Sequence, residues 1–589
     1  MGLTWNLDGL YSSFEDEKFK NDLQTLISKA EGTTETITKL LASDKSDVEI
    51  IETYLKENET MRSLIAPVAS FSSLSFSTDS TNASALNSFQ KIQSLNALLI
   101  PGQVMFAKWL VTKDLDKMLS QSDLIQTYEF YLKNILKNEK YALDEKTESI
   151  IERMRQTGSR SFDTLQKKIS SGMTEEVEID GKTEVMPLQA IRNLAFEKDP
   201  DKRLAGYHAE MKVYKKNEEV SATALNGIKG ESLTLNELRG YDSPLEKTLI
   251  NSYMNRETLD AMLDAMKDAL PKFRAYYKKK AELLGHKNGL PFYDIFAPMG
   301  SSDITFPYEK GKALVLEQFA TFSEELRDFA QTAFDNDWID VEPRKGKSGG
   351  AFCAGLFSLK ESRILLNYTG KLNNAITLAH ELGHGFHNYN LYNEAPLNIG
   401  SPMPLAETAS IFCETIVKNA ALKDADPESK FSILEVAIQG YSQVIVDIYS
   451  RFLFESKVFE ARKGGPLSPD QIKTFMLEAQ EESYGDGLDP EFRHPYMWMC
   501  KTHYYIPDLD FYNFPYAFGL LFAKGIYAKY KEMGQSFVPK LNTLLRSTGK
   551  MNVVDVAKQM DIDVTDKSFW QTSLNEICAE IDEFIELSK

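Results

Sequence analysis

Histidine and glutamate residues are concentrated in one short stretch of this chain. The stretch reads Thr377-Leu-Ala-His-Glu-Leu-Gly-His-Gly-Phe-His387 and holds three of the seven histidines. His380 and His384 are four residues apart, so on a helix their side chains share one face, about 5–6 Å apart. Two imidazoles at that spacing can bind one zinc ion at about 2.0–2.1 Å. Glu381 is placed to take a proton from an attacking water.

A catalytic zinc ion usually has three protein ligands and one exchangeable water. We favour Glu407 as the third ligand, on a predicted helix that follows a loop rich in proline and glycine. Small residues around Glu407 would let this helix approach the first one closely. Glu414 lies seven residues later on the same face, where it can accept the free N–H of a ligating imidazole. His387 is an alternative ligand, but the three histidines run along the helix, which favours a supporting position for it.

Two glycines, Gly383 and Gly385, interrupt the predicted zinc helix. Each costs a helix interior about 1 kcal/mol relative to alanine. A helix that served only for packing would not favour two of them together. We therefore interpret them as the wall of a cleft that a peptide backbone approaches.

Aromatic residues are dense in a third region, 497–519, which also contains a histidine. If this region is helical, the hydroxyls of Tyr512 and Tyr516 point the same way, although Pro515 lies between them. Peptide hydrolysis places negative charge on the former carbonyl oxygen, which O–H donors and an imidazolium at His503 can stabilise. The alternative interpretation of the tyrosines is an aromatic core.

The elements that must position these residues are mostly helices. Amphipathic patterns predict helices over 15–30, 261–284 and 569–587, with Pro271 kinking or splitting the second. Strands are predicted over 363–368 and in a hairpin at 177–185, where Asp180-Gly181 favours a type I′ turn. The turn-rich segment 197–202 suggests an N-terminal helical region, 1–196, and a catalytic region, 197–589.

The composition is that of a soluble globular protein. Among 589 residues, 86 are acidic and 67 are Lys or Arg, which gives a formal charge of −19 and disfavours nucleic-acid binding. Four widely spaced cysteines fit a reducing compartment without disulfides. Neither a secretory signal nor an uninterrupted apolar span is present in the sequence. We expect a cytoplasmic protein, with no membrane partner, that is a monomer or small homo-oligomer.

Together these motifs resemble the oligoendopeptidase F family, which belongs to the thimet oligopeptidase and neurolysin group of zinc peptidases. The resemblance spans nearly the whole chain, and its zinc motif with a downstream glutamate is specific. The chain departs from it in two places: Asn373-Asn374 stands where several relatives have an acidic residue, and 506–510 looks like an insertion. The residues that carry the resemblance lie in Trp5–Tyr11, Lys347–Cys353, Leu366–Gly370, His380–His387, Glu407–Ser410, and the segment with His503, Tyr512 and Tyr516.

The resemblance implies a mainly α fold, an elongated two-lobed helical body with a deep central channel, and a small hairpin or short sheet near the active site. It implies a zinc endopeptidase that cuts short peptides, because a narrow channel excludes folded proteins. The implied roles are one zinc ion per chain held by His380, His384 and Glu407, Glu381 as general base, and His503, Tyr512 and Tyr516 as substrate-contacting or oxyanion-stabilising groups. The alternatives are a zinc carboxypeptidase on a related helical scaffold and a non-catalytic peptide-binding protein.

Overall fold

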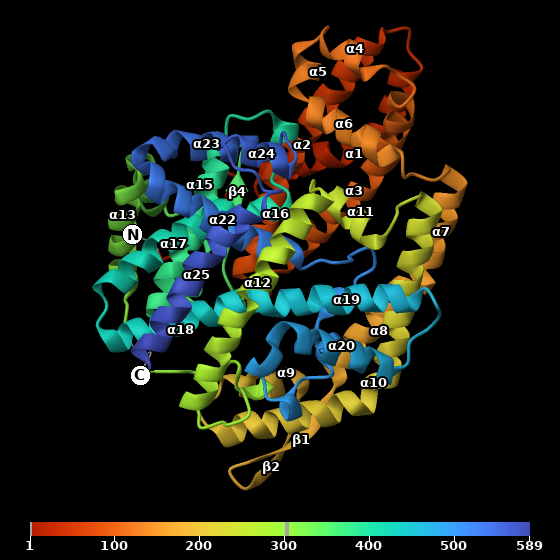
Figure 1. Cartoon of the computed structure of the whole chain (residues 1–589). Coiled ribbons are helices and arrows are strands. Elements are labelled where there is room, and N and C mark those ends of the chain that lie inside the picture. Colours follow the sequence, from red (N-terminus) through yellow and green to blue (C-terminus); the bar gives the residue numbers. More distant parts are fainter. Residues whose placement is uncertain (1–2, 301–304) are drawn as a thin grey trace. The chain divides into compact units, whose positions relative to one another are not determined.

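The computed structural model describes residues 3–300 and 305–589 and consists mainly of helices (Figure 1). Within the described residues there are 25 α-helices and five short strands, so the predicted mainly helical fold is confirmed. The chain forms two compact units, each assembled from segments far apart in the sequence. Unit 1 is Met1–Ala142, Asp303–Ala421 and Lys529–Asp561, and unit 2 is Leu143–Ser302, Leu422–Ala528 and Ile562–Lys589. The central channel and the division into 1–196 and 197–589 stay predictions.

Unit 1 contains six N-terminal helices, a three-stranded sheet and the long helix α15, which carries His380 and His384. Its helices and strands are α1 (Glu17–Leu41), α2 (Asp47–Thr78), α3 (Ala83–Leu110), α4 (Leu115–Leu119), α5 (Asp123–Thr127), α6 (Glu129–Glu139), α13 (Tyr308–Phe322), α14 (Glu324–Asp335), β3 (Ile339–Asp340), β4 (Phe352–Leu356), β5 (Glu361–Leu365), α15 (Leu372–Leu391), α16 (Met403–Ala406), most of α17 (Thr408–Asp424), α23 (Val538–Ser547) and α24 (Val553–Lys558).

The N-terminal segment of the chain holds the sheet of unit 1. The Arg363 guanidinium in β5 donates from Nε to the Asn6 carbonyl at 2.7 Å. The Trp5 ring packs against Phe352 in β4, with ring centroids 6.2 Å apart. In the sheet β5 lies in the centre, parallel to β3 and antiparallel to β4. The strand predicted over 363–368 is present as β5, shifted slightly toward the N-terminus.

This sheet lies directly beside helix α15. The helix packs against both β4 and β5, and Figure 1 shows β4 next to it. Asn388 on α15 donates from Nδ2 to Ser362 Oγ in β5 at 3.4 Å. A short sheet therefore supports the helix that carries the candidate metal ligands, as the resemblance implied.

Unit 2 contains the longest helix of the chain, α10, and one hairpin. Its helices and strands are α7 (Glu145–Thr157), α8 (Ser159–Gly172), β1 (Thr174–Ile179), β2 (Lys182–Pro187), α9 (Leu188–Asn193), α10 (Pro200–Arg239), α11 (Pro244–Asn251), α12 (Arg256–Leu283), α18 (Pro427–Ser442), a π-helical turn (Gln443–Asp447), α19 (Ile448–Arg462), α20 (Pro469–Tyr484), α21 (Met497–Cys500), most of α22 (Phe514–Met533) and α25 (Lys567–Leu587).

The hairpin of unit 2 has the predicted turn. Strands β1 and β2 pair antiparallel, with Ile179 opposite Lys182. Asp180 and Gly181 between them both have positive φ, at 52° and 72°. Positive φ at both central residues defines a type I′ turn, which matches the twist of the strands. The hairpin prediction is confirmed.

The predicted amphipathic helices are present as α1, α12 and α25, and Pro271 does not split the second of them. Helix α12 runs without a break from Arg256 to Leu283, although Pro271 lies inside it. The buried side of α12 packs along α25, as Figure 1 shows for the two labelled helices. Helix formation in proteins depends mostly on burial of an apolar face. Burial on both sides of Pro271 therefore outweighs the loss of one backbone hydrogen bond.

A buried ion cluster in unit 2 anchors the segment 506–510, which looks like an insertion in the sequence. Lys229 Nζ lies 2.8 Å from Asp510 Oδ1 and 2.7 Å from Glu455 Oε1, and all three side chains are at most 3% exposed. Burial alone would lower the pKa of the Lys229 ammonium, but the two carboxylates raise it above its usual value. Phe511 N donates to Glu455 Oε2 at 3.1 Å, so the cluster fixes the backbone directly before Tyr512.

Lys229→Met is expected to lower the free energy of unfolding by about 3–5 kcal/mol, because it leaves two carboxylates buried without their cation. Chemical denaturation followed by circular dichroism measures this change. The matched control is Lys216→Met on the same helix, where the lysine side chain is 62% exposed although its partner Glu175 is 9% exposed. Because this lysine stays largely in water, removing it should cost less than about 1 kcal/mol. Equal effects of the two variants would contradict the buried role of Lys229.

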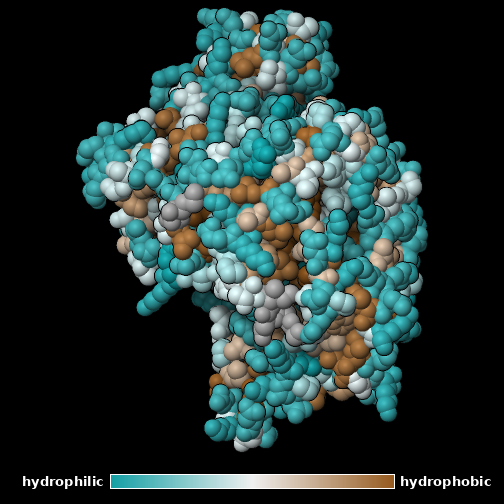
Figure 2. All heavy atoms as spheres, turned by 90° about the vertical axis from the view of Figure 1, so that its left-hand side faces the viewer, coloured by the Kyte–Doolittle hydropathy of each residue, from teal (hydrophilic) through white to brown (hydrophobic). Residues whose placement is uncertain are grey.

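The drawn face of the molecule, the cysteines and the apolar stretches can be compared with the sequence-based expectations. The face drawn in Figure 2 is predominantly hydrophilic, with smaller hydrophobic patches, as expected for globular proteins. All four cysteines are free. Within the described residues, one stretch, 427–462, is long and apolar enough to cross a membrane by length and composition. In its most apolar window 61% is buried, as in the core helix of a soluble protein.

Candidate metal centre

Helix α15 presents the two histidines of the His-Glu-x-x-His motif on one face. The helix begins at Leu372, and Asn374 caps its start: Asn374 Oδ1 accepts hydrogen bonds from the backbone N–H groups of Thr369 and Lys371, at 3.0 and 3.1 Å. Asn374, one of the two asparagines at which the chain departs from the resemblance, therefore organises the loop ahead of the helix. The imidazoles of His380 and His384 lie next to each other, with ring centroids 5.0 Å apart.

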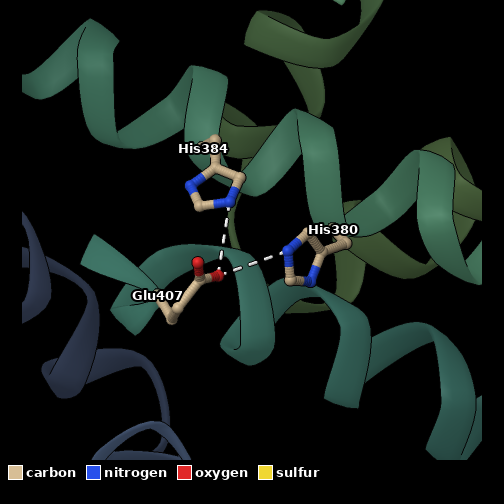
Figure 3. Close-up of side chains that lie close together, drawn as sticks. All are labelled: His380, His384 and Glu407. Carbon is tan, nitrogen blue, oxygen red and sulfur yellow. Dashed lines mark ion pairs between the residues drawn. The ribbon is translucent and has the colours of Figure 1, made fainter. Parts of the chain in front are cut away.

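Glu407 completes a cluster of three metal-binding side chains. Its Oε2 atom lies 3.3 Å from His380 Nε2 and 3.3 Å from His384 Nε2. One ligand atom from each residue lies within 4.8 Å of the other two. Figure 3 shows both rings, from one helix, directed at the carboxylate that comes from the following segment. Two imidazole nitrogens and one carboxylate oxygen are the ligand types of catalytic zinc sites, so this donor set fits a zinc ion.

Close contact between α15 and α17 brings these side chains together. A Cβ atom at Gly383 would lie 2.6 Å from the Ala409 carbonyl oxygen and 2.6 Å from Ser410 Cα, so the helices touch backbone to backbone there. At Gly385 a Cβ would meet the Phe329 ring at 2.8 Å. Our interpretation of the two glycines as the wall of a peptide-binding cleft is therefore wrong. They serve packing within unit 1, and small residues of α17 are the other half of that contact.

Gly383→Ala is expected to destabilise the fold by about 1–3 kcal/mol, because overpacking outweighs the gain in helix propensity. Gly32→Ala in helix α1 is the matched control, since a Cβ there meets no atom of the described residues within 4 Å. That control should gain about 0.5–1 kcal/mol from propensity alone. Thermal and denaturant unfolding of both variants checks the opposite signs. A stable Gly383→Ala variant would mean that α15 and α17 can separate without cost.

Two further side chains orient the cluster. Glu414 Oε2 lies 3.0 Å from His380 Nδ1, the ring nitrogen that faces away from Glu407. Ser410 Oγ donates to Glu407 Oε2 at 2.8 Å. A carboxylate on the outer nitrogen fixes the tautomer of an imidazole and raises its basicity. The contact of the Ser410 hydroxyl was not predicted from the sequence, although its three-residue spacing from Glu407 on a helix could have indicated it.

Mutual pairing strongly shifts the pKa values of this cluster. Burial alone would lower the pKa of His380, but Glu407 and Glu414 raise it to about 10. Burial alone would raise the pKa of Glu407, but hydrogen bonds from His380 and His384 hold it well below its usual range. The carboxylates thus make this position strongly attractive to positive charge.

Glu381 is a buried acid with one carboxyl oxygen, Oε2, that has no hydrogen-bond partner among the described residues. Its side chain is 5% exposed. Burial raises its pKa, which the positive charges of His380 and His384 partly offset. A carboxyl group whose pKa is raised toward neutrality is well suited to take up and release a proton.

His387 does not join the metal-binding cluster. It is 5% exposed, and its Nε2 lies 3.0 Å from Thr548 Oγ1. Burial lowers the pKa of His387 to about 4, so the ring is neutral. The structure therefore places this histidine in a supporting position inside unit 1.

His503 lies in unit 2, in a buried and uncharged state. Asn513 Oδ1 accepts from Arg451 Nη1 at 3.0 Å, so its Nδ2 is the group that donates to His503 Nε2 at 2.7 Å. Burial and the charges of Arg451, Lys229 and Lys501 lower the pKa of His503 to about 3. The imidazolium expected from the sequence is therefore wrong: His503 is a neutral imidazole whose Nε2 accepts a hydrogen bond.

The two tyrosines of unit 2 meet at their hydroxyls. Tyr512 precedes α22, and Tyr516 lies in its first turn after Pro515, where proline is tolerated. The hydroxyl oxygens are 2.5 Å apart, and Tyr516 is 37% exposed. The pair therefore reaches the surface of unit 2, in contrast to a purely internal aromatic core.

Comparisons with known proteins point to one family. A model of Peptidase family M3 matches residues 194–576, and a model of Oligopeptidase F matches residues 110–174. An oligoendopeptidase F homolog of Lactococcus lactis is 25% identical over 88% of this chain and 86% of its own. Oligopeptidase PepF of Bacillus subtilis is 22% identical over 86% of this chain and 75% of its own. The solved oligoendopeptidase-F from Enterococcus faecium shares the fold, with a TM-score of 0.70 and 18% identity over 97% of this chain and 98% of its own.

Proposed function

Because the chain belongs to peptidase family M3, we propose that it is a zinc-dependent endopeptidase that hydrolyses short peptides. The observation that carries this proposal is the convergence of His380, His384 and Glu407 on one point. The names of its relatives, oligoendopeptidase F and oligopeptidase, support peptides as substrates.

We assign His380, His384 and Glu407 as the residues that hold one zinc ion per chain. A zinc ion supplies Lewis-acid polarisation of the reacting oxygen atoms when it is bound there. Glu414 holds the outer nitrogen of His380, and Ser410 holds Glu407. Both contacts limit rotation of the ligands and keep the imidazole nitrogens directed at the metal position.

Glu381 is the general base in this proposal. Its unpartnered Oε2 takes the proton of the attacking water and later delivers it to the leaving amine. Burial favours this role, because a desolvated carboxylate holds a proton more strongly than an exposed one. Tyr512, Tyr516 and His503 are assigned to contact the substrate and stabilise the oxyanion, on the basis of the resemblance, with His503 acting as a neutral group.

The remaining expectations concern partners and location. We propose short peptides as the physiological partners, no nucleic acid or membrane partner, and a monomer or small homo-oligomer. A cytoplasmic location agrees with four free cysteines, which persist in reducing compartments.

Metal analysis combined with a quenched-fluorescence peptide assay tests the proposed function. The purified protein should contain one equivalent of zinc and cleave an internally quenched peptide whose two ends are blocked. Chelator should abolish cleavage, and added zinc should restore it. Release of only C-terminal amino acids from a peptide with a free C-terminus would instead favour the carboxypeptidase alternative. Peptide binding without cleavage in the zinc-loaded protein would favour the non-catalytic alternative.

A further inference from the structure

The path of the connection between α15 and α17 determines whether Glu407 lies next to the two histidines. This connection, residues 392–407, contains only the one-turn helix α16 and a 3-10 turn at Pro396–Asn398. It forms no continuous helix that could hold Glu407 at a fixed distance from α15. Its path must therefore be set by contacts with other parts of unit 1.

Three contacts from distant parts of unit 1 hold the first half of this connection. Arg62 on α2 donates from Nη2 to the Ile399 carbonyl at 2.7 Å. Asn398 donates from Nδ2 to the Thr127 carbonyl at 2.9 Å. Lys550 and Glu394 form an ion pair at 2.7 Å. These contacts fix the connection against α2, α5 and the segment that follows α23.

The tightest contact comes from the two residues directly after α23, Thr548 and Gly549. Thr548 is fully buried, and its Oγ1 lies 3.1 Å from the Gly400 carbonyl oxygen. The same Oγ1 lies 3.0 Å from Nε2 of His387, which is on α15, and 3.0 Å from the Leu545 carbonyl oxygen in α23, so the two carbonyl oxygens share its single proton. One hydroxyl therefore joins the metal-binding helix, the connection and the end of α23.

Gly549 brings its backbone against the connection. A Cβ atom at this position would lie 1.9 Å from the Asn398 carbonyl oxygen and 3.0 Å from the Gly400 carbonyl oxygen. Both are backbone atoms, so no side-chain rotation could relieve the overlap. Only glycine permits the observed path of the connection at this point.

We propose that His387, Thr548 and Gly549 form a clamp that positions Glu407 for metal binding. The three residues are not metal ligands themselves; they act by fixing residues 398–400, from which the chain runs through Pro402 and Pro404 to Glu407. Metal sites demand ligand positions within about 0.2 Å, so a displaced connection weakens binding even when all three ligands are present. The link from the clamp to zinc binding rests on the proposed function. The fixing of residues 398–400 by the clamp does not.

Gly549→Ala and Gly400→Ala are the matched pair that tests the clamp. A Cβ at Gly400 meets no atom of the described residues within 4 Å, although it lies on the same connection. Gly549→Ala should raise the zinc dissociation constant by about tenfold or more, the lower end of the range for groups that hold metal ligands directly. Gly400→Ala should stay within about twofold of the unchanged protein. Competition with a chromophoric zinc chelator measures both constants.

Thr548 provides a second test if Gly549→Ala does not fold. Thr548→Val keeps the shape of the side chain but removes the hydroxyl, and should weaken zinc binding by about tenfold or more. Thr548→Ser keeps the hydroxyl and should restore binding to within a few-fold. Equal zinc affinities of the valine and serine variants would overturn the proposal, because a purely packing role responds to volume and not to the hydroxyl.

Hydrogen–deuterium exchange of the metal-free protein separates the clamp from the proposed function. In Gly549→Ala or Thr548→Val, peptides that cover 398–411 should exchange faster, whereas peptides from α1 should not change. Unchanged exchange in 398–411 would overturn the clamp, whether or not zinc binds. If these variants exchange faster but the protein binds no zinc, the clamp is supported and the zinc ion of the proposed function is wrong.

Discussion

Replacement of Glu381 by glutamine should lower kcat by about 10²- to 10⁴-fold while zinc stays bound. That range is the usual contribution of a positioned general base. The amide has nearly the same size as the carboxylate but cannot take a proton from water. The ligand set is untouched, because Glu381 lies outside the cluster of His380, His384 and Glu407. Steady-state cleavage of a quenched peptide, with zinc content measured on the same sample, checks both parts.

The control for this variant is Glu317→Gln, an exposed position on α13. It should leave both kcat and zinc content unchanged. Near-normal cleavage by Glu381→Gln would remove the proposed base. Loss of zinc from Glu381→Gln would mean that this side chain contributes to metal binding instead.

His384→Ala should abolish stoichiometric zinc binding and, with it, peptide cleavage. Catalytic zinc sites usually have three protein ligands, and this variant leaves two. Changes to supporting residues already cost about 10- to 100-fold in affinity, so loss of a ligand should cost more than about 100-fold. Metal analysis after dialysis against a weak chelator measures the loss.

His208→Ala is the matched control, because His208 is exposed and lies in unit 2. It should keep one equivalent of zinc and full cleavage. Retention of one zinc per chain in His384→Ala would refute the proposed ligand set, even if activity fell.

Local spacing made much of the candidate site predictable. His380 and His384 had to share a face because four residues make about one helical turn, and Glu414 shares a face with Glu407 at seven residues for the same reason. Helix α25 and the hairpin at Asp180-Gly181 could be predicted equally well, since each depends on a short pattern of residue types. Glu407 could be chosen as the partner of the two histidines because small residues surround it in the sequence. In the structure, Gly383 of α15 packs against two of these small residues, Ala409 and Ser410.

Features that depend on distant residues could not be predicted. The charge state of His503 follows from its burial and from Arg451, Lys229 and Lys501, which other helices bring near it. That Pro271 would not split α12 could not be predicted, because the local cost of proline is visible in the sequence, whereas the burial of α12 against α25 is not. The contact of Gly549 with Asn398 joins positions about 150 residues apart, and a lone glycine carries no sign of such a partner.

The composite make-up of unit 1 has a consequence for how the protein matures during synthesis. Chains leave the ribosome N-terminus first, and domains fold as units once their residues are available. Unit 1 needs residues up to Asp561, so its N-terminal helices must wait while almost the entire polypeptide is translated. When α15 has been made, its sheet already exists and α17 follows soon after, but α23 and α24 are still missing. The last contacts of unit 1 can therefore form only when translation is nearly finished.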